Sequence, residues 1–484
     1  MLLSALLSSI ITEEVIGADN IEISDITADS RLCKRDSLFV AVRGVYVDGH
    51  RFISSAVSNG ACAVVCEEIP EDVNAEITWI KVANSSVALG CLASRWFGDP
   101  SRELSLIGVT GTNGKTTIAT LIYEMARLNN RRAGLLSTVV NKIEDEEIPS
   151  THTTPDPIEL NGLLRRMVDA GCTVAAMEVS SHAAHQHRIA GLHFTGGIFT
   201  NLTRDHLDYH KTFEAYLQAK QSFFDILPKG AFALTNLDDR NGMIMVQNTR
   251  AKVYTYSLRA DADFRGRVVE DRIDGMAISF NGVEVETLFT GRFNASNLTA
   301  VYGASVLMGY DNERIPVEMS RLEPVSGRFQ TFRSANGITA IVDYAHTPDA
   351  LINVLDTIRE IVGRKNSVIT VCGCGGNRDK GKRPLMADAA VRRSDRVILT
   401  SDNPRDEDPS AIIDDMRSGL TAEQLTKTIT IVDRREAIRT AVALARPSDV
   451  ILIAGKGHET YQIIGKETNH FDDREEIRSA FATI

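Results

Sequence analysis

Short apolar runs alternate with amphipathic stretches along most of the chain. Up to residue 100, the runs DSLFVAV, CAVVCEE and ITWIKVA predict short strands, because β-branched and apolar residues dominate them. Apolar residues at positions 2, 3, 6, 7 and 10 predict a short amphipathic helix at the N-terminus. The sequence Gly98-Asp99-Pro100 predicts the end of a helix, and we expect a boundary between structural units there.

From residue 101 onward, buried strands alternate with helical patterns. The run LSLIGVT predicts a strand that leads into a glycine-rich turn and a helix beginning near Lys115, and TVAAMEV, GGIFTN and GAFALTN predict further strands. Such alternation predicts parallel βαβ units and a doubly wound sheet. The stretch 252–293 departs from this pattern and predicts antiparallel hairpins, after which NLTAVYGASVLMG predicts a helix again.

Residues 323–330 (EPVSGRFQ) predict a second boundary. After it, the runs GITAIVDYAH, NSVITVCGCGG, SDRVILTSDN, TITIVD and DVILIAGKG predict another series of strands with helices between them. Each run ends in a glycine, polar or charged turn, and ligands of open α/β sheets bind beyond the carboxyl ends of the strands. The pattern therefore predicts an α/β fold whose functional residues follow the strands.

Composition narrows the class of protein. The 484 residues predict two to four domains, and a hydrophobic content of 43% with 24% charged residues is typical of globular proteins. The net charge of −11 argues against non-specific nucleic-acid binding. We expect no membrane span, because no 18 apolar residues run together, and a cytosolic protein, because the N-terminus lacks a basic leading region and a cleavage motif. The seven cysteines lack zinc-finger spacing and predict free thiols.

The first glycine-rich turn has the composition of a phosphate-binding loop. The sequence GTNGKTT occupies 111–117 between a predicted strand and a predicted helix, although Val109 stands where the usual motif has its first glycine. Backbone N–H groups at a helix N-terminus bind anions. Lys115 would bridge the terminal phosphates, and the Thr116 hydroxyl would face a magnesium ion. The alternative is a tight turn with a capping threonine. No guanine-reading N-K-x-D sequence follows, so the loop favours ATP.

Further candidate residues follow the next strands. Glu178 ends the run TVAAMEV, where a carboxylate would hold magnesium or cap a helix. His206 follows GGIFTN and is equally compatible with a metal ligand and with an ordinary loop histidine. Lys220 lies on a predicted amphipathic helix, where the local pattern predicts a solvated side chain. Asn294 and Asn297 in GRFNASN suit hydrogen bonds to a purine or a turn.

Taken together, the motifs resemble those of the Mur ligases. The matching stretches are GTNGKTT, TTP, EVSSH, QHR, TNLTRDHLDYH, AK, GRFNASN, SGRF, DYAHTPDAL, GCGGNRDKGKRP, DNPR and AGKGHE, which extend over essentially the whole chain. Within the family, the chain resembles the ligases that add meso-diaminopimelate.

The resemblance implies three domains, which we place at residues 1–100, 101–325 and 326–484. The first would be a small α/β domain that binds the uridine nucleotide (UDP-MurNAc). The second would be a P-loop ATPase domain with a doubly wound, mostly parallel sheet. The third would be a Rossmann-like domain that binds the amino acid.

The resemblance also implies the chemistry. ATP would phosphorylate the γ-carboxylate of D-glutamate in UDP-MurNAc-L-Ala-D-Glu, and the amine of the amino acid would attack the acyl phosphate. A tetrahedral intermediate would then collapse to amide and phosphate, as a step of peptidoglycan synthesis. This activity requires ATP and Mg²⁺, with two ions expected, in a monomeric cytoplasmic enzyme.

The resemblance assigns residues to each part of the site. The ATP positions are Gly111, Thr112, Asn113, Gly114, Lys115, Thr116, Thr117, Asn294, Arg328 and Asp343. The muramoyl-nucleotide positions are Ser30, Thr153, Thr154, Ser180, Gln186 and Arg188. The diaminopimelate positions are Arg378, Asp402, Asn403, Pro404, Arg405, Gly455 and Glu459. The catalytic positions are Lys115, Glu178, His206, Lys220 and His346.

The resemblance implies a specific chemical role for three of these assignments. Lys220 matches the lysine that Mur ligases carry as a carbamate (N6-carboxylysine), which would join Thr116, Glu178 and His206 as a magnesium ligand. Arg405, with Arg378, would bind the distal carboxylate of diaminopimelate, which lysine lacks. Glu459 would bind an ammonium group. Near the expected uracil site, RGVYVDG (43–49) differs from the relatives, so contacts by Val45, Tyr46 and Val47 are not assigned.

Three alternatives remain open. A lysine-adding ligase of the same family is the nearest. A folate polyglutamate ligase shares the phosphate loop, but DNPR and the N-terminal DSR and LFVA sequences argue against it. A nucleotide-dependent switch or scaffold without acyl transfer is the alternative from another class.

Overall fold

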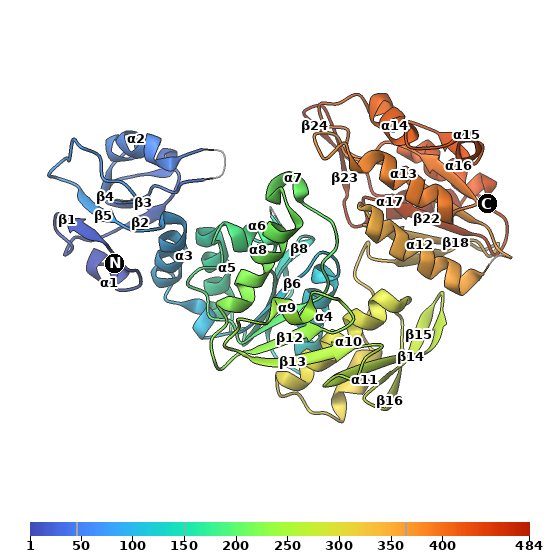
Figure 1. Cartoon of the computed structure of the whole chain (residues 1–484), viewed down its shortest axis with the longest axis horizontal. Helices are drawn as coiled ribbons and strands as arrows, with labels where there is room; N and C mark the ends of the chain where they lie inside the picture. The colour runs from blue at the N-terminus through green and yellow to red at the C-terminus, as the bar shows by residue number, and fades with distance from the viewer. Residues whose placement is uncertain (45–46, 151, 364) are drawn as a thin grey trace.

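The computed structural model describes residues 1–44, 47–150, 152–363 and 365–484. The chain forms three α/β units, each built around its own sheet. Figure 1 shows the N-terminal unit in blue, the central unit in green and yellow, and the C-terminal unit in orange. The predicted α/β class with three domains is confirmed.

The N-terminal unit is a small sheet with helices packed on it. Its strand order is β1-β5-β4-β3-β2, in which β2 to β5 are parallel and β1 is antiparallel. The strands are β1 (Glu14–Ile16), β2 (Asp25–Thr27), β3 (Ser37–Val40), β4 (Ala61–Cys66) and β5 (Thr78–Lys81). The helices are α1 (Leu3–Leu7), α2 (Ile53–Ser58) and α3 (Ser85–Trp96). The predicted N-terminal amphipathic helix is confirmed: Leu3 and Leu6 are buried.

The central unit contains the largest sheet, with the order β16-β15-β14-β13-β12-β11-β6-β10-β7-β8-β9. Its strands are β6 (Ser105–Thr110), β7 (Ala133–Leu136), β8 (Val140–Ile143), β9 (Glu146–Pro149), β10 (Val174–Glu178), β11 (Gly196–Phe199), β12 (Phe232–Asn236), β13 (Lys252–Ser257), β14 (Phe264–Arg272), β15 (Gly275–Phe280) and β16 (Val283–Thr287). Its helices are α4 (Lys115–Leu128), α5 (Pro157–Asp169), α6 (Ser181–His185), α7 (Leu207–His210), α8 (Phe213–Asp225), α9 (Gly242–Met245), α10 (Arg292–Leu307) and α11 (Arg314–Ser320). The strands from β7 to β14 in this order pair in parallel, as predicted.

One part of the expectation for 252–293 is wrong. The strand β13 pairs in parallel with both β12 and β14, so it extends the parallel sheet. Only β14, β15 and β16 form the predicted antiparallel hairpins. The run VYTYSL is short and apolar, and such a pattern does not distinguish a parallel strand from an antiparallel one.

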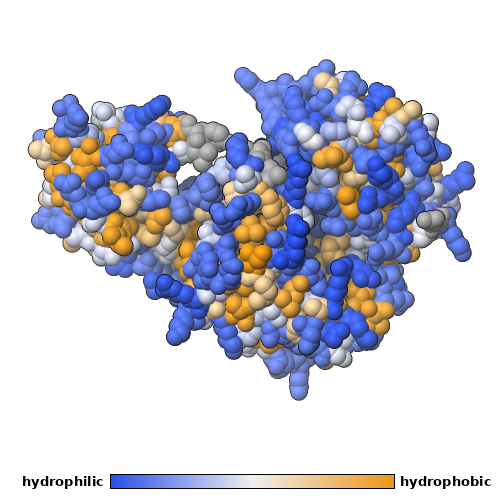
Figure 2. Space-filling model, viewed as in Figure 1, coloured by the Kyte–Doolittle hydropathy of each residue, from blue (hydrophilic) through white to orange (hydrophobic). Residues whose placement is uncertain are grey.

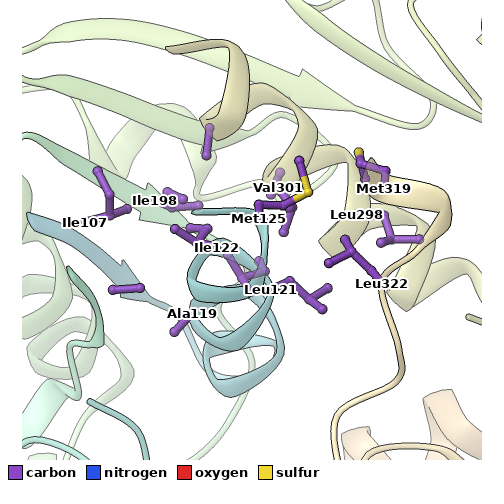
Figure 3. Packing of buried hydrophobic residues seen from close by; sticks show 14 of the residues in the cluster. Ile107, Ala119, Leu121, Ile122, Met125, Ile198, Leu298, Val301, Met319 and Leu322 are labelled. Atoms are coloured by element: carbon purple, nitrogen blue, oxygen red, sulfur yellow. The ribbon is translucent and has the colours of Figure 1, made fainter. Parts of the chain in front are cut away.

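The core of the central unit holds α4 in place behind the glycine-rich turn. Apolar residues recur along α4 at helical spacing, and Ile118, Leu121, Ile122 and Met125 are all buried. Figure 3 shows the side chains of α4 packed with those of α10 and α11, including Val301. This packing fixes the N-terminus of α4 at the end of β6.

The C-terminal unit has a smaller sheet with the order β17-β18-β22-β19-β20-β21, parallel except for β17, and a separate β23-β24 hairpin. Its strands are β17 (Gln330–Arg333), β18 (Thr339–Asp343), β19 (Val368–Cys372), β20 (Arg396–Leu399), β21 (Thr428–Thr430), β22 (Val450–Ala454), β23 (Tyr461–Ile464) and β24 (Glu467–His470). Its helices are α12 (Pro348–Val362), α13 (Lys382–Arg393), α14 (Pro409–Arg417), α15 (Ala422–Leu425), α16 (Arg434–Leu444) and α17 (Asp473–Phe481).

Helices α3, α10 and α12 contribute to the contacts between the units. A Cβ placed on Gly90 of α3 would lie 2.7 Å from the carbonyl oxygen of Ala190, and α3 also packs against α5. Arg292 of α10 pairs with Glu360 of α12 at 3.6 Å. Figure 2 shows a largely hydrophilic surface, with a hollow between the N-terminal and C-terminal units above the central one. Within the described ranges, no helix has both the length and the apolar character needed to cross a membrane.

Candidate active site

The turn after β6 has the backbone geometry of the predicted phosphate loop. Gly111 and Gly114 have φ angles of 147° and 87°, which residues with a side chain rarely adopt. Space is also lacking: a Cβ on Gly111 would lie 1.8 Å from Oγ1 of Thr200, and one on Gly114 would lie 2.5 Å from Oδ1 of Asn297. The helix α4 begins at Lys115, so the predicted strand, turn and helix are confirmed.

Neighbouring segments anchor this loop. The backbone N–H of Thr112 donates to the carbonyl of Asn201 at 2.8 Å, and that of Asn113 donates to the Asn201 side chain at 3.0 Å. The hydroxyl of Thr112 lies 3.0 Å from that of Tyr216. The N-terminus of α4, whose first N–H groups lack partners within the helix, has the arrangement that binds anions. Thr116 and Thr117 lie in this first turn and are buried.

Lys220 lies beside the loop, although it is distant in sequence. It projects from α8, and only 1% of the residue is exposed, so the solvated side chain predicted from the helix pattern is wrong. Its ammonium group donates to the carbonyl oxygen of Gly111 at 2.7 Å, and Lys115 donates to the same oxygen at 3.0 Å. Burial and the neighbouring Lys115 charge lower the pKa of Lys220 well below its usual value.

Glu178 ends β10 next to the β6 loop, because β10 and β6 are adjacent parallel strands. Its side chain is buried and accepts a hydrogen bond from the backbone N–H of Thr138 at 2.7 Å. Its carbonyl oxygen accepts from the hydroxyl of Thr154 at 2.8 Å. Glu178 does not cap a helix here, because Ser180 caps α6.

His206 lies in the loop after β11, in the left-handed region with φ of 53°. Its Nε2 lies 3.3 Å from a carboxylate oxygen of Asp205. Burial is the main cause that lowers the pKa of His206 to about 4, so the imidazole is neutral at physiological pH. Among the residues the structure describes, no group of three His, Cys, Asp or Glu side chains is arranged to hold a metal.

Residues from the C-terminal unit reach the phosphate loop. Arg328 donates from Nη2 to the hydroxyl of Thr116 at 3.1 Å, and its guanidinium lies 4.5 Å from the ring centroid of Tyr344. The carboxylate of Asp343 accepts from the backbone N–H groups of Phe329 and Ala345, both at 2.7 Å. Asp343 therefore fixes the segment that carries Arg328.

His346 and Asn294 lie near this junction. His346 donates from Nδ1 to the carbonyl of Tyr344 at 2.9 Å, which leaves Nε2 as the free acceptor of the neutral ring. Burial is the main cause that lowers the pKa of His346, and Asp205 of the central unit acts in the opposite direction. Asn294 is buried in α10, and its side chain donates to the carbonyl of Thr290 at 2.9 Å.

The structure brings together all the residues expected at the muramoyl nucleotide except Ser30. The Thr154 hydroxyl accepts from the backbone N–H of Ser180 at 3.2 Å, and the Thr154 carbonyl accepts from Arg188 at 2.8 Å. Arg188 also donates twice to Gln186, at 3.0 and 2.7 Å. Thr153 accepts from the hydroxyl of Thr138 at 3.1 Å.

Ser30 begins a short 3-10 helix in the N-terminal unit, where its carbonyl accepts from Asn59 at 2.8 Å. Val45 and Tyr46 lie outside the described residues, while Val47 is exposed.

The predicted diaminopimelate residues gather at the carboxyl ends of β19, β20 and β22. Asn403 donates to the carboxylate of Glu459 at 2.8 Å. Burial and the neighbouring Asp402 raise the pKa of Glu459. A Cβ on Gly455 would lie 3.1 Å from a carboxylate oxygen of Asp402, so the two chain segments are close.

The two arginines both lie close to Gly375. A Cβ on Gly375 would lie 3.0 Å from Nη1 of Arg405 and 3.7 Å from Cγ of Arg378. Arg405 has φ of 51° and donates to the carbonyl of Gly376 at 2.9 Å. Its backbone N–H donates to Ile463 of β23 at 3.1 Å, so the hairpin orients this arginine.

Sequence reasoning missed Lys456, which is fully buried at the centre of this cluster. Its ammonium group donates to Asn403 at 3.1 Å, to Glu459 at 3.2 Å and to the carbonyl of Tyr461 at 2.6 Å. Lys456 therefore holds two predicted substrate residues in fixed positions. The available signal was its place in AGKGHE, directly after the buried strand β22.

Comparison with known proteins identifies the family. Three family models match: "Mur ligase family, catalytic domain" over 22–97, "Mur ligase middle domain" over 109–305, and "Mur ligase, glutamate ligase domain" over 327–457. The chain belongs to the Mur ligase family of amide-bond-forming, ATP-dependent enzymes.

Full-length relatives share one description. One is the UDP-N-acetylmuramoyl-L-alanyl-D-glutamate--2,6-diaminopimelate ligase of Phocaeicola vulgatus, which is 59% identical over 100% of this chain and 100% of its own. The protein with the same description from Geobacillus kaustophilus is 44% identical, and the match covers 95% of each chain. A solved structure of a protein with the same description is 34% identical, with a TM-score of 0.70, and the match covers 99% of this chain and 98% of that one. MurF from Acinetobacter baumannii, at 17% identity and a TM-score of 0.64 over 100% of this chain and 98% of its own, shares the fold.

Proposed function

We propose that this enzyme adds meso-2,6-diaminopimelate to the D-glutamate γ-carboxylate of UDP-MurNAc-L-Ala-D-Glu, using ATP, in peptidoglycan precursor synthesis. The observation that carries the proposal is that Arg378 and Arg405 both lie close to Gly375, with Glu459 close by. Two guanidinium groups and a carboxylate suit a ligand end that carries both a carboxylate and an ammonium group. The relatives at high identity over the full chain support this substrate.

ATP would bind between the central and C-terminal units. The first turn of α4 and Lys115 would hold its phosphates, and Arg328, which already contacts Thr116, would approach them from the other unit. Asn294, Asp343 and His346 would lie around the nucleoside. Transfer of the γ-phosphoryl group to the substrate carboxylate gives ADP and an acyl phosphate.

The donor groups present fit Mg²⁺. Thr116 and Glu178 offer the oxygen ligands that this ion prefers, and His206 is neutral, so its lone pair is free. Magnesium at phosphate sites takes one or two carboxylates and completes its shell with phosphates and water, so a preformed cage is not needed. When bound, the ion would neutralise charge on the transferred phosphoryl group. We expect two ions.

The environment of Lys220 fits a carbamate. Its amine is buried and faces Lys115, which disfavours a second positive charge there. A neutral amine attacks CO₂, forms an N–C bond and releases one proton to give a carbamate. That product would be an anion beside Lys115 and a further oxygen ligand for magnesium.

The second half-reaction takes place at the C-terminal unit. Glu459, Asp402 and Asn403 would orient the diaminopimelate, and Lys456 would keep Glu459 and Asn403 in place. The amine attacks the acyl carbon, a proton is lost, and the tetrahedral intermediate releases phosphate to leave the amide. Thr153, Thr154, Ser180, Gln186 and Arg188 would hold the muramoyl dipeptide, with Ser30 on the uridine side.

We assign the uridine nucleotide to residues 1–100, ATP to 101–325 and the amino acid to 326–484. We further propose that the enzyme is a cytoplasmic monomer.

The test is a phosphate-release assay with purified enzyme, ATP and Mg²⁺. We expect phosphate release only when both the muramoyl dipeptide and diaminopimelate are present. ATP consumption that is independent of the dipeptide would instead favour a nucleotide-dependent switch, and equal turnover of lysine would favour a lysine-adding ligase.

A further inference from the structure

The loops that carry Arg378 and Arg405 are separate segments of the C-terminal unit. Arg378 lies between β19 and α13, and Arg405 lies between β20 and α14. Both side chains lie close to Gly375: a Cβ added there would lie 3.0 Å from Nη1 of Arg405 and 3.7 Å from Cγ of Arg378. The two arginines come from different loops, so their separation depends on how these loops are held together.

Direct backbone contacts leave little freedom at the base of the loops. The N–H of Gly376 donates to the carbonyl of Asn403 at 2.9 Å. A Cβ on Gly376 would lie 1.8 Å from the carbonyl oxygen of Pro404. The loops touch here, but these contacts lie before Arg378 and Arg405 and do not by themselves fix the segments after them.

A buried arginine ties the far ends of the loops together. Arg383, at the start of α13, is 1% exposed and donates to both carboxylate oxygens of Glu407, at 2.9 and 3.0 Å. Glu407 follows Arg405 by two residues, and it also accepts from the backbone N–H of Asn377 at 2.6 Å. Arg383 makes another bond to Asp415 of α14 at 2.8 Å.

The charge on Glu407 is strongly favoured. The hydrogen bonds from Arg383 are the main cause that lowers the pKa of Glu407 to about 2. Glu407 is therefore ionised at every physiological pH, and its pairing with the planar fork of Arg383 is bidentate. Glu407 lies two residues after Arg405, and Arg383 lies five residues after Arg378, in the first turn of α13.

We propose that Arg383 and Glu407 are positioning residues that set the separation of Arg378 and Arg405, and so determine selectivity for an acceptor with a distal carboxylate. This inference rests on the proposed function and deepens it. Neither residue needs to touch the substrate. A lysine acceptor has no distal carboxylate, so its binding depends much less on the spacing of the two guanidinium groups.

The experiment compares Glu407→Gln with Asp415→Asn in the full-length enzyme. Both variants remove one charge from the partners of Arg383, but Asp415 lies on neither loop. The measurements are KM for diaminopimelate, KM for ATP, the ratio of kcat/KM for diaminopimelate over lysine, and the midpoint of thermal unfolding. The second variant is Arg383→Lys, which keeps the positive charge but loses the planar guanidinium that bonds both carboxylate oxygens of Glu407.

We expect Glu407→Gln to raise KM for diaminopimelate on the order of 10-fold or more and to lower the diaminopimelate-to-lysine ratio, with KM for ATP unchanged. Arg383→Lys should change the same quantities in the same direction, and Asp415→Asn should leave them near wild type. The proposal would be overturned if Glu407→Gln or Arg383→Lys kept the wild-type ratio of kcat/KM for diaminopimelate over lysine. It would also be overturned if Asp415→Asn changed this ratio as much as Glu407→Gln does. If the wild-type enzyme itself does not use diaminopimelate, the proposed function fails instead.

Discussion

Lys115 and Lys220 donate to the same carbonyl oxygen, that of Gly111, at 3.0 and 2.7 Å. Two ammonium groups so close together in a buried site repel each other, and burial penalises both charges. Lys115 begins α4, where we expect the ATP phosphates to balance its charge. No anion is expected to balance a charge on Lys220 in the same way. The arrangement therefore favours a neutral or modified Lys220.

The first prediction concerns this lysine. Replacing Lys220 with alanine should lower turnover on the order of 10²-fold, because the carbamate that we propose as a magnesium ligand is lost. A small carboxylate such as acetate or formate should restore part of the rate by occupying the vacated space. Full activity of Lys220→Ala without an additive would refute the carbamate role.

Arg405→Ala should weaken diaminopimelate binding by about 2–5 kcal/mol, because the distal carboxylate would lose its charged partner. Calorimetric titration of the variant with diaminopimelate and, separately, with an ATP analogue measures the two affinities. ATP affinity should stay at the wild-type value. Equal losses for both ligands would show that Arg405 acts on the fold rather than on the acceptor.

The glycine at 114 offers a test with a matched control. Gly114 and Gly309 both have positive φ, of 87° and 75°, but only Gly114 has an atom within 4 Å of an added Cβ. Alanine should cost about 1–2 kcal/mol of stability at either position through the strained φ angle. Only Gly114→Ala should also lose ATP binding, measured by nucleotide titration. Normal ATP affinity in Gly114→Ala would contradict the assignment of the phosphate loop.

The buried thiols predict a pH dependence of chemical modification. Burial raises the pKa of Cys372 and Cys374 to about 12. Because the thiolate is the reactive form, on the order of one in 10⁴ of these groups would be ionised at pH 8, and the fraction rises with pH. In the native protein, Cys62 and Cys91, which are half-buried, should react with a thiol reagent first.

Mass spectrometry after limited alkylation identifies the modified residues. Denatured protein is the control, in which all seven cysteines should react. Rapid labelling of Cys372 in the native state at pH 8 would contradict the burial described above.

Local patterns predicted much of the fold. The turn at GTNGKTT was predictable because strand, glycine turn and helix are encoded within one short segment, and Glu178 because it ends an apolar run. The direction of β13 was not predictable, since parallel and antiparallel strands share the same composition. Lys220 was mispredicted from its helix pattern, because its burial depends on Gly111, a residue far away in the sequence. Only the resemblance to the Mur ligases identified Lys220 as a candidate site residue.

The residues around the expected diaminopimelate site were also only partly predictable from the sequence. DNPR was recognisable as a motif, but Lys456 and the pair Arg383 and Glu407 look like ordinary charged residues in the sequence. Their roles depend on burial and on contacts between distant segments: Arg383 and Glu407 lie 24 residues apart, and Lys456 and Asn403 lie 53 residues apart. Such contacts follow from the order of the strands and not from local composition.

The most direct test of the central claim is a competition experiment. The enzyme is given UDP-MurNAc-L-Ala-D-Glu, ATP and Mg²⁺ with equal concentrations of meso-diaminopimelate and L-lysine, and the muramoyl product is identified by mass spectrometry. We predict the diaminopimelate adduct as the dominant product, formed together with equimolar ADP and phosphate. A product that carries mainly lysine, or ATP hydrolysis without an amide product, would contradict the account.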